Sequence, residues 1–355
     1  MRGGRLCDPL EDDKTRNTKI KEVSGVTQAQ MNPYPYSDTN KRYYTYDYYL
    51  RHTFGGKCAK LPIDAGFTCP NIDGRCAVGG CIYCSDRGSG DFAQDSALSV
   101  REQIRAQKEI FARKWDVSRC IAYFQAHTNT YAPLSVLKAC YEEALAEEGI
   151  VGINIATRAD CLPEDVVEYL AQLAERTRVT VELGLQSSND LTAKRINRGH
   201  DYETFCRGVE RLRAASDKIG IGVHIIFGLP REGDAEMMRT VEDVSRLHPD
   251  MVKIHLLHVI RNTALARMYE RGEYEPLERA HYIRLVADAI ECLPPDTVIG
   301  RLTGDGKAED LIAPLWSQKK TTVINDVDKL LYERETYQGI QFARDESISC
   351  RKRFL

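Results

Sequence analysis

Several features that would assign this 355-residue chain to a common class are missing. No apolar run approaches the ~18 residues that a membrane-spanning helix needs, and residues 1–14 lack the apolar stretch of a secretory signal. The formal net charge is −3, from 49 basic and 52 acidic side chains, so no bulk positive field attracts nucleic acid or anionic membrane, although a local basic patch stays open. These absences predict a cytoplasmic protein without a membrane partner.

Two glycine-rich nucleotide motifs are also missing. No GxGxxG follows an expected strand, and no GxxxxGK[ST] sequence occurs anywhere in the chain. The sequence therefore gives no support to a nicotinamide-binding fold or to a P-loop nucleotide enzyme.

Short β-branched runs alternate with longer helical patterns from Cys58 onward, as in a parallel sheet with helical crossovers. The expected strands are 59–64, 119–125, 150–156, 179–185, 219–228 and 251–260, with a weaker seventh at 297–302. Six or seven such units favour a full or partial barrel over an open doubly wound sheet, although the count alone does not separate them. We expect a partial (β/α)6 TIM-like barrel with its chemistry at the carboxyl ends of the strands.

Three regions are expected. Residues 1–40 are polar and without periodicity, which predicts a mobile leader. Met31 is a candidate for an alternative start, and the sequence does not decide between the two starts. Residues 41–303 form the barrel, and residues 304–355 a helical C-terminal extension. The barrel opens with five tyrosines between Tyr43 and Tyr49, which fit either an amphipathic helix or a platform on which bases stack.

Four of the twelve cysteines fall within sixteen positions, in the segment 66–90. Cys81 and Cys84 form a C-x2-C pair, Cys69 lies eleven intervening residues upstream of it, and Cys76 lies between them. In a reducing compartment such a cluster indicates a metal site rather than disulfides. Zinc and an iron–sulfur cluster both take cysteine thiolates, and the spacing alone does not choose between them.

The context of the cysteines resembles the radical S-adenosylmethionine (SAM) superfamily. The loop follows the first expected strand, and an aromatic residue, Tyr83, precedes the last cysteine. The long first gap, together with YFQAHTNTYAP, TRAD, VELGLQS, NRGH, HIIFGLPRE and HVIRNT, is similar to the elongator-catalytic-subunit-like branch. RYYTYDYYL, DAGFTCPN, GSGDFA and LIAPLWS are similar to a family of uncharacterised bacterial radical SAM proteins with a C-x11-C-x2-C motif.

This resemblance implies that Cys69, Cys81 and Cys84 hold a [4Fe-4S] cluster and leave one iron free for SAM. An external donor of the flavodoxin or ferredoxin type would reduce the cluster, and reductive cleavage of SAM would give a 5'-deoxyadenosyl radical. The branch implies tRNA wobble-uridine modification, for which Lys319, Lys320 and the basic residues 351–353 offer phosphate contacts. The chain shows no acetyltransferase domain, so acetyl-coenzyme A chemistry is not predicted.

The resemblance also implies SAM contacts at the strand ends. They are Asn129, Thr130, Arg158, Glu182, Gln186, Gly228, His258 and Val259. Asn129 and Thr130 stand where the superfamily usually has Gly-Gly-Glu, and the polar segment 195–200 either faces substrate or caps a helix. Two alternatives stay open: a radical SAM enzyme that acts on a protein or small metabolite, and a zinc-stabilised nucleic-acid-binding module without catalysis.

Overall fold

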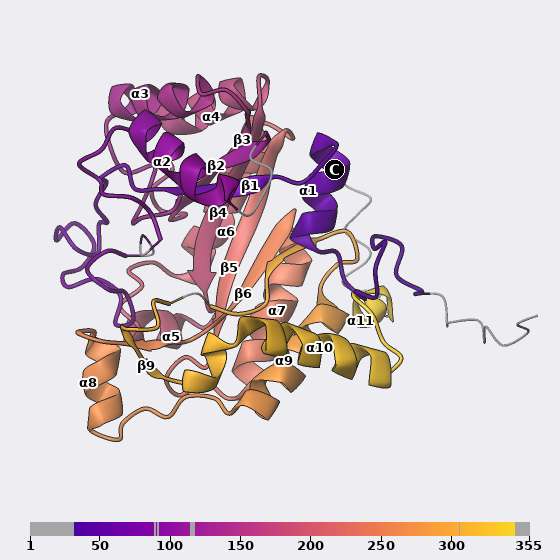
Figure 1. The fold of residues 1–355 in the computed structure, drawn as a ribbon. Helices are drawn as coiled ribbons and strands as arrows, with labels where there is room; N and C mark the ends of the chain where they lie inside the picture. The colour runs from indigo at the N-terminus through magenta and orange to yellow at the C-terminus, as the bar shows by residue number, and fades with distance from the viewer. Residues whose placement is uncertain (1–31, 89, 91, 114–117, 305, 345–355) are drawn as a thin grey trace, which may run out of the picture. The chain divides into compact units, whose positions relative to one another are not determined.

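The computed structural model describes residues 32–88, 90, 92–113, 118–304 and 306–344 (Figure 1). The chain divides into two units, Met1–Met31 and Asn32–Leu355. The first unit, which holds most of the expected leader, lies outside the described residues, and so do the basic residues 351–353.

Seven parallel strands form one sheet that curls into a half-barrel, which confirms the expected fold. The strands lie in the order β1 (Ala59–Ile63), β2 (Cys120–Phe124), β3 (Ile150–Thr157), β4 (Arg178–Gln186), β5 (Ile219–Phe227), β6 (Met251–Leu256) and β8 (Val298–Arg301). Neighbouring strands thus follow the chain order, and their carboxyl ends share one edge.

The expected strand 251–260 is the main departure. It ends as β6 at Leu256, where the next backbone amide, that of Leu257, donates to the carbonyl of Phe227 on the neighbouring strand. The chain then leaves the sheet, and β7 (Val259–Ile260) pairs antiparallel with β9 (Leu311–Ala313). The apolar run is continuous, so the sequence alone does not mark this break.

Helices pack against the outer face of the sheet (Figure 1). The crossover helices are α2 (Val100–Ala112), α3 (Leu134–Leu145), α4 (Glu164–Ala174), α5 (Asp190–Arg195), α6 (Tyr202–Ala215), α7 (Asp234–Leu247), α8 (Ala264–Glu270) and α9 (Arg279–Cys292). The C-terminal region adds η1 (Leu315–Gln318), α10 (Lys320–Glu333) and α11 (Ile340–Arg344), of which α10 and α11 pack on α9. None of the described helices is both long and apolar enough to cross a membrane.

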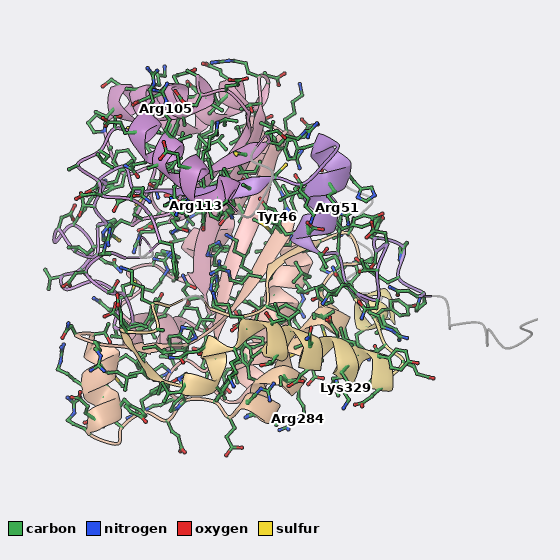
Figure 2. All side chains as sticks on the ribbon, in the orientation of Figure 1. Tyr46, Arg51, Arg105, Arg113, Arg284 and Lys329 are labelled. Carbon is green, nitrogen blue, oxygen red and sulfur yellow. The ribbon has the colours of Figure 1, made fainter. Side chains whose placement is uncertain are left out.

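Three of the five tyrosines lie in helix α1 (Tyr46–Phe54), which confirms the helical interpretation from Tyr46 onward, whereas Tyr43 and Tyr44 precede the helix. The helix lies at the amino ends of the strands, because Ile299 of β8 donates its backbone amide to Tyr44 and forms a bridge with Thr45. Tyr46, labelled in Figure 2, begins the helix and stacks on Tyr49, with ring centroids 5.9 Å apart. The tyrosines therefore cap the barrel mouth opposite the cysteine loop.

Strand alternation places polar side chains inside the barrel. His224 and Lys253 are register partners on β5 and β6, and Lys253 is in turn partnered by Arg301 on β8. Glycines give these side chains room, because a Cβ on Gly222 would lie 3.1 Å from Cγ of Glu182, and one on Gly300 would lie 3.0 Å from Cγ of Lys253.

Candidate active site

Three of the four clustered cysteines face one cavity. The loop that follows β1 carries Cys69, Cys81 and Cys84 into the lining of a cavity of about 290 Å³ at the carboxyl ends of the strands. Cys76 is exposed and outside the described lining, and its sulfur lies 3.8 Å from Oδ2 of Asp160. The structure thus separates the three predicted ligands from the fourth cysteine.

The pKa values of two thiols in the loop, those of Cys81 and Cys84, shift in opposite directions. A hydrogen bond from Cys84 and, against the effect of burial, the positive charges of Arg198 and Arg158 lower the pKa of Cys81 to about 5. The same hydrogen bond raises the pKa of Cys84 well above its usual value, so one proton serves both sulfurs. Among the described residues, no three His, Cys, Asp or Glu side chains already lie close enough together to hold a metal ion.

The segment after α5 holds the cysteine loop in place. The amide of Asn71 donates to the carbonyls of Asn197 at 2.6 Å and Arg198 at 2.9 Å, and it lies 3.4 Å from the sulfur of Cys81. In return the amide of Asn197 donates to the carbonyls of Val78 and Gly80. The polar segment 195–200 therefore positions the loop, and only its Arg198 is among the described residues that line the cavity.

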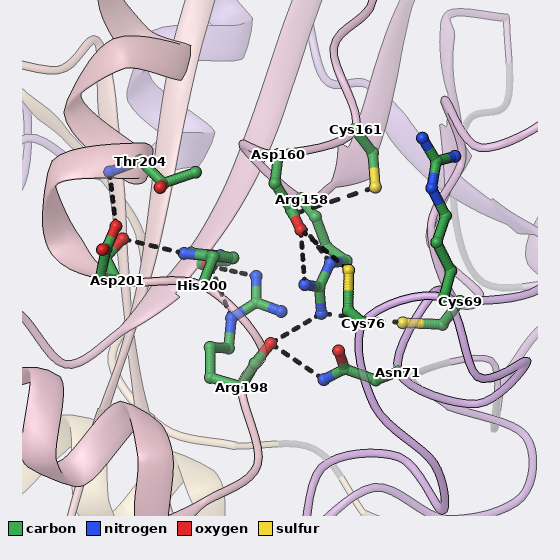
Figure 3. A network of polar contacts seen from close by, with 12 residues as sticks. Cys69, Asn71, Cys76, Arg158, Asp160, Cys161, Arg198, His200, Asp201 and Thr204 are labelled. Atoms are coloured by element: carbon green, nitrogen blue, oxygen red, sulfur yellow. Dashed lines mark hydrogen bonds and ion pairs between the residues drawn. The ribbon is translucent and has the colours of Figure 1, made fainter.

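Arg158 lies between the cysteine loop and the segment 195–200, as Figure 3 shows. Its guanidinium binds both oxygens of Asp160, at 2.9 and 2.8 Å, and donates to the carbonyl of Arg198 at 2.8 Å. One of its nitrogens lies 4.0 Å from the sulfur of Cys69. Arg158 is 3% exposed, so a fixed positive charge stands beside the cysteines with part of its edge toward the cavity.

A buried ionic network forms the inner end of the cavity. One oxygen of Glu182 accepts from Lys60 at 3.1 Å and from Asn154 at 2.7 Å, and the other binds His224 at 2.8 Å and the ammonium of Lys253. Burial would raise the pKa of Glu182, but the two lysines and His224 outweigh burial and hold it well below its usual range. Glu182 is therefore ionised at neutral pH.

The cavity histidines are neutral at the same pH. Burial, helped by Lys253, lowers the pKa of His224 to about 4, and burial, helped by Lys320, lowers that of His258 to about 4. Burial also lowers the pKa of His255 well below its usual value. The Nε2 atoms of His255 and His258 are buried without a hydrogen-bond partner, so the cavity lining presents two unused polar atoms.

The eight predicted SAM contacts divide into two groups. Arg158, Glu182, Gln186 and His258 line the cavity, whereas Asn129, Thr130, Gly228 and Val259 lie outside its described lining. Asn129 is fully buried and donates to the carbonyls of Ala126 and Ala156, and the hydroxyl of Thr130 lies 2.6 Å from that of Thr157. The side chains of Asn129 and Thr130 thus tie the loop after β2 to β3.

Sequence reasoning missed five residues that build the site. They are Lys60, Asn71, Tyr123, Lys253 and Arg301. Four of them lie on strands, where the period of two places each on the inner face. Lys60, Lys253 and Arg301 are charged residues inside apolar strand patterns, and this was the available signal for those three.

Comparisons with known proteins agree with this geometry. Residues 71–244 match the Radical SAM superfamily, and residues 249–333 match the Radical_SAM C-terminal domain. The chain is 48% identical over 323 residues to the uncharacterised protein YtqA of Bacillus subtilis, covering 90% of this chain and 99% of the relative. The chain therefore belongs to the radical SAM superfamily, and it is an enzyme whose cofactors are a [4Fe-4S] cluster and SAM.

More distant similarity extends to the elongator branch. The tRNA uridine(34) acetyltransferase of Methanocaldococcus infernus is 27% identical over 248 residues, which are 69% of this chain and 43% of that protein. The structure of archaeal Elp3 from M. infernus, lacking its N-terminal residues 1–46, shares the fold with a TM-score of 0.60 at 19% identity, over 79% of this chain and 64% of that one.

Proposed function

We propose that this radical SAM enzyme modifies the side chain of a wobble uridine in tRNA. The observation that carries the proposal is the similarity to a tRNA uridine(34) acetyltransferase over 69% of the chain. The match covers only 43% of that relative's length. The proposal therefore concerns the radical step and not acetyl transfer.

The residues of the cavity fit the two cofactors. Cys69, Cys81 and Cys84 would hold the cluster, because three thiols face one cavity and one of them already favours the thiolate that metals bind. When bound, the cluster and SAM supply a radical that abstracts a hydrogen atom from substrate. Asp160 and the carbonyl of Arg198 hold the guanidinium of Arg158 in place, and its two remaining N–H donors would orient the SAM carboxylate, because Arg158 lines the cavity. An electron donor of the flavodoxin or ferredoxin type would complete the system.

An exposed aromatic ring at the cavity edge supports a nucleotide substrate. Phe92 lines the cavity and is 48% exposed, and the ammonium of Lys320 lies 5.9 Å from its ring centroid. A ring and a cation in this arrangement suit a base and its phosphate. The tyrosines of α1 lie at the other mouth of the barrel, so Phe92 takes the stacking role in this proposal.

Nucleoside mass spectrometry of total tRNA tests the proposal. A strain that lacks the gene should lose one wobble-uridine derivative and accumulate its precursor, and the wild-type gene should restore the profile. A gene encoding Cys84→Ala should not restore it, whereas one encoding Cys76→Ala should. An unchanged nucleoside profile in the deletion strain would contradict the tRNA substrate and favour a protein or small metabolite.

A further inference from the structure

His255 on β6 carries a polar atom that the fold leaves unused. Its side chain lines the cavity, and among the described residues its buried Nε2 atom has no hydrogen-bond partner. The neighbouring histidine on β5 differs, because Nε2 of His224 lies 2.8 Å from a carboxylate oxygen of Glu182. The centroids of the two histidine rings are 5.1 Å apart. A buried polar atom without a partner is unfavourable, so His255 is suited to meet a polar group of another molecule.

Strand geometry puts His255 between the ionic network and the open end of the cavity. His255 follows Lys253 by two residues on the same face of β6, about 7 Å nearer the carboxyl end of the strand. Lys253 belongs to the network around Glu182. The three cysteines predicted to hold the cluster line the same cavity. A group bound at His255 therefore shares the cavity with these cysteines, as removal of a hydrogen atom from that molecule requires.

His255 offers a neutral nitrogen rather than a charge. Burial lowers the pKa of His255 well below its usual value, and His224, Arg301 and Lys253 lower it further. Phosphates and carboxylates bind most strongly to charged donors, which a neutral imidazole does not provide. The ring therefore favours an uncharged hydrogen-bonding group.

The edge of a nucleobase has the matching chemistry. A neutral imidazole nitrogen either donates or accepts a hydrogen bond, according to its tautomer. The imide edge of uracil has an N–H donor between two carbonyl acceptors, so this edge can satisfy either tautomer. Enzymes that act on a base take it out of the stack and bind its hydrogen-bonding edge in a pocket.

We propose that Nε2 of His255 binds the imide edge of the substrate uracil and so positions the base in the cavity. This inference rests on the proposed function, and it adds that the base itself enters the barrel as far as β6. His258 lies beyond the end of β6 and stays a predicted SAM contact. His255 is then a substrate-binding residue, distinct from the residues predicted to bind SAM.

Binding of 13C-labelled uridine to the SAM-loaded holoprotein, measured by anaerobic NMR titration with the cluster left oxidised, tests the proposal without tRNA. We expect saturable binding of uridine and about five- to tenfold weaker binding of 3-methyluridine, whose methyl group covers the imide edge. His255→Phe, which keeps a ring, should weaken uridine binding by a similar factor. His255→Gln keeps a polar group and should retain most of the affinity. His52→Phe, a change of an exposed histidine on α1, is the matched control.

Melting temperature and SAM affinity distinguish substrate binding from a structural role. The fold makes no hydrogen bond to Nε2 among the described residues, so His255→Phe should not lower the melting temperature of the holoprotein without uridine. Its affinity for SAM should also match that of the wild type. A fall in either quantity that accounts for the loss of uridine binding would overturn the proposal.

Three results of the titration itself would also overturn the proposal: no saturable uridine binding, equal binding of 3-methyluridine, or equal affinity in His255→Phe. Displacement of uridine by SAM would overturn it too, because uridine would then occupy the site of SAM itself. An altered tRNA profile in the deletion strain, with uridine binding that does not depend on His255, would reject the role of His255 alone. An unchanged profile would reject the tRNA substrate and leave a uracil-binding residue standing if the titration succeeds.

Discussion

Two cysteines of the same loop, Cys84 and Cys76, lie in different surroundings. Cys84 faces the cavity beside Cys81, whereas Cys76 points to Asp160 on the loop after β3. Cys84→Ala should therefore abolish cluster assembly and SAM cleavage, and Cys76→Ala should leave both largely intact. Iron and sulfide content of anaerobically reconstituted protein, with 5'-deoxyadenosine as product, measures the two effects. Equal losses in both variants would mean that the ligand set includes Cys76.

Glu182 is the residue on which the inner network depends. Glu182→Gln leaves Lys60 and Lys253 near a neutral amide, and breaking a buried ion pair in this way costs about 3–5 kcal/mol of unfolding free energy. Chemical denaturation at pH 7 measures the change. Glu203→Gln is the control, because Glu203 pairs with Arg207 on the surface, with a side chain 80% exposed, and such pairs contribute about 0.3–0.5 kcal/mol.

The same variant makes a pH prediction. The pKa of Glu182 is lower in the folded protein than its model-compound value of 4.5, so its contribution to stability is complete above that pH. The contribution disappears as the pH falls through the lowered folded value. The difference in stability between wild type and Glu182→Gln should therefore be constant from pH 7 to about pH 5 and shrink in more acidic solution. A difference that grows on acidification would contradict an ionised Glu182.

At the scale of elements, helix α6 positions the loop that carries Arg158. A Cβ on Gly208 would lie 2.8 Å from Cβ and 2.9 Å from the carbonyl oxygen of Ala159, so Gly208→Ala forces the helix and the loop apart. We expect a loss of about 1–3 kcal/mol from overpacking, although alanine is the better helix former. Denaturation midpoints and SAM affinity should both fall.

Gly56→Ala provides the comparison for that change. Its added Cβ would meet only the side chain of Arg119, at 3.1 Å, which can move aside. If Gly208→Ala were as stable as Gly56→Ala and bound SAM equally well, the close contact between α6 and the loop after β3 would not constrain the site.

The strands could be predicted from sequence, but the inner network could not. β-branched runs bounded by helical patterns located all seven strands of the main sheet, and the break after Leu256 was missed because Leu257 and Val259 continue the apolar run. Alternation shows which face Lys60, Glu182 or Lys253 occupies. It does not show which of them meet, because register between strands is set by the packing of the whole sheet.

The sequence predicts that Cys69, Cys81 and Cys84 act together because motif and spacing are local, and the structure places all three in the lining of one cavity. The hydrogen bonds that hold the cysteine loop in place could not be predicted. The amide of Asn71 donates to carbonyls of a segment that lies more than a hundred residues later in the chain. Asn129 and Thr130 show a second limit of local patterns: polar residues at a strand end predict SAM contacts, and sequence alone does not show that in this structure their side chains bind backbone and hydroxyl groups of the fold.

At the scale of the whole molecule, the two ends of the barrel differ: one carries the cavity and the other is closed. The cysteine loop occupies the carboxyl ends of the strands, and α1 closes the amino ends together with the segment before it. Tyr34, in the part of the expected leader that is described, is 2% exposed, and its hydroxyl donates to the carbonyl of Pro295 before β8. Lys41 forms an ion pair with Asp328 on α10. Residues 32–41 therefore connect the closed mouth to the C-terminal helices.

Two truncations separate this segment from the residues before it. A chain that begins at Met31 keeps Tyr34 and Lys41 and should retain the melting temperature of the full chain. A chain that begins at Arg42 loses a buried tyrosine, whose removal costs about 3–5 kcal/mol by analogy with large-to-small core substitutions. Its melting temperature should fall, and Tyr34→Ala in the full chain should account for most of the fall. A fall of similar size in the melting temperature of the chain that begins at Met31 would show that residues 1–30 also stabilise the barrel.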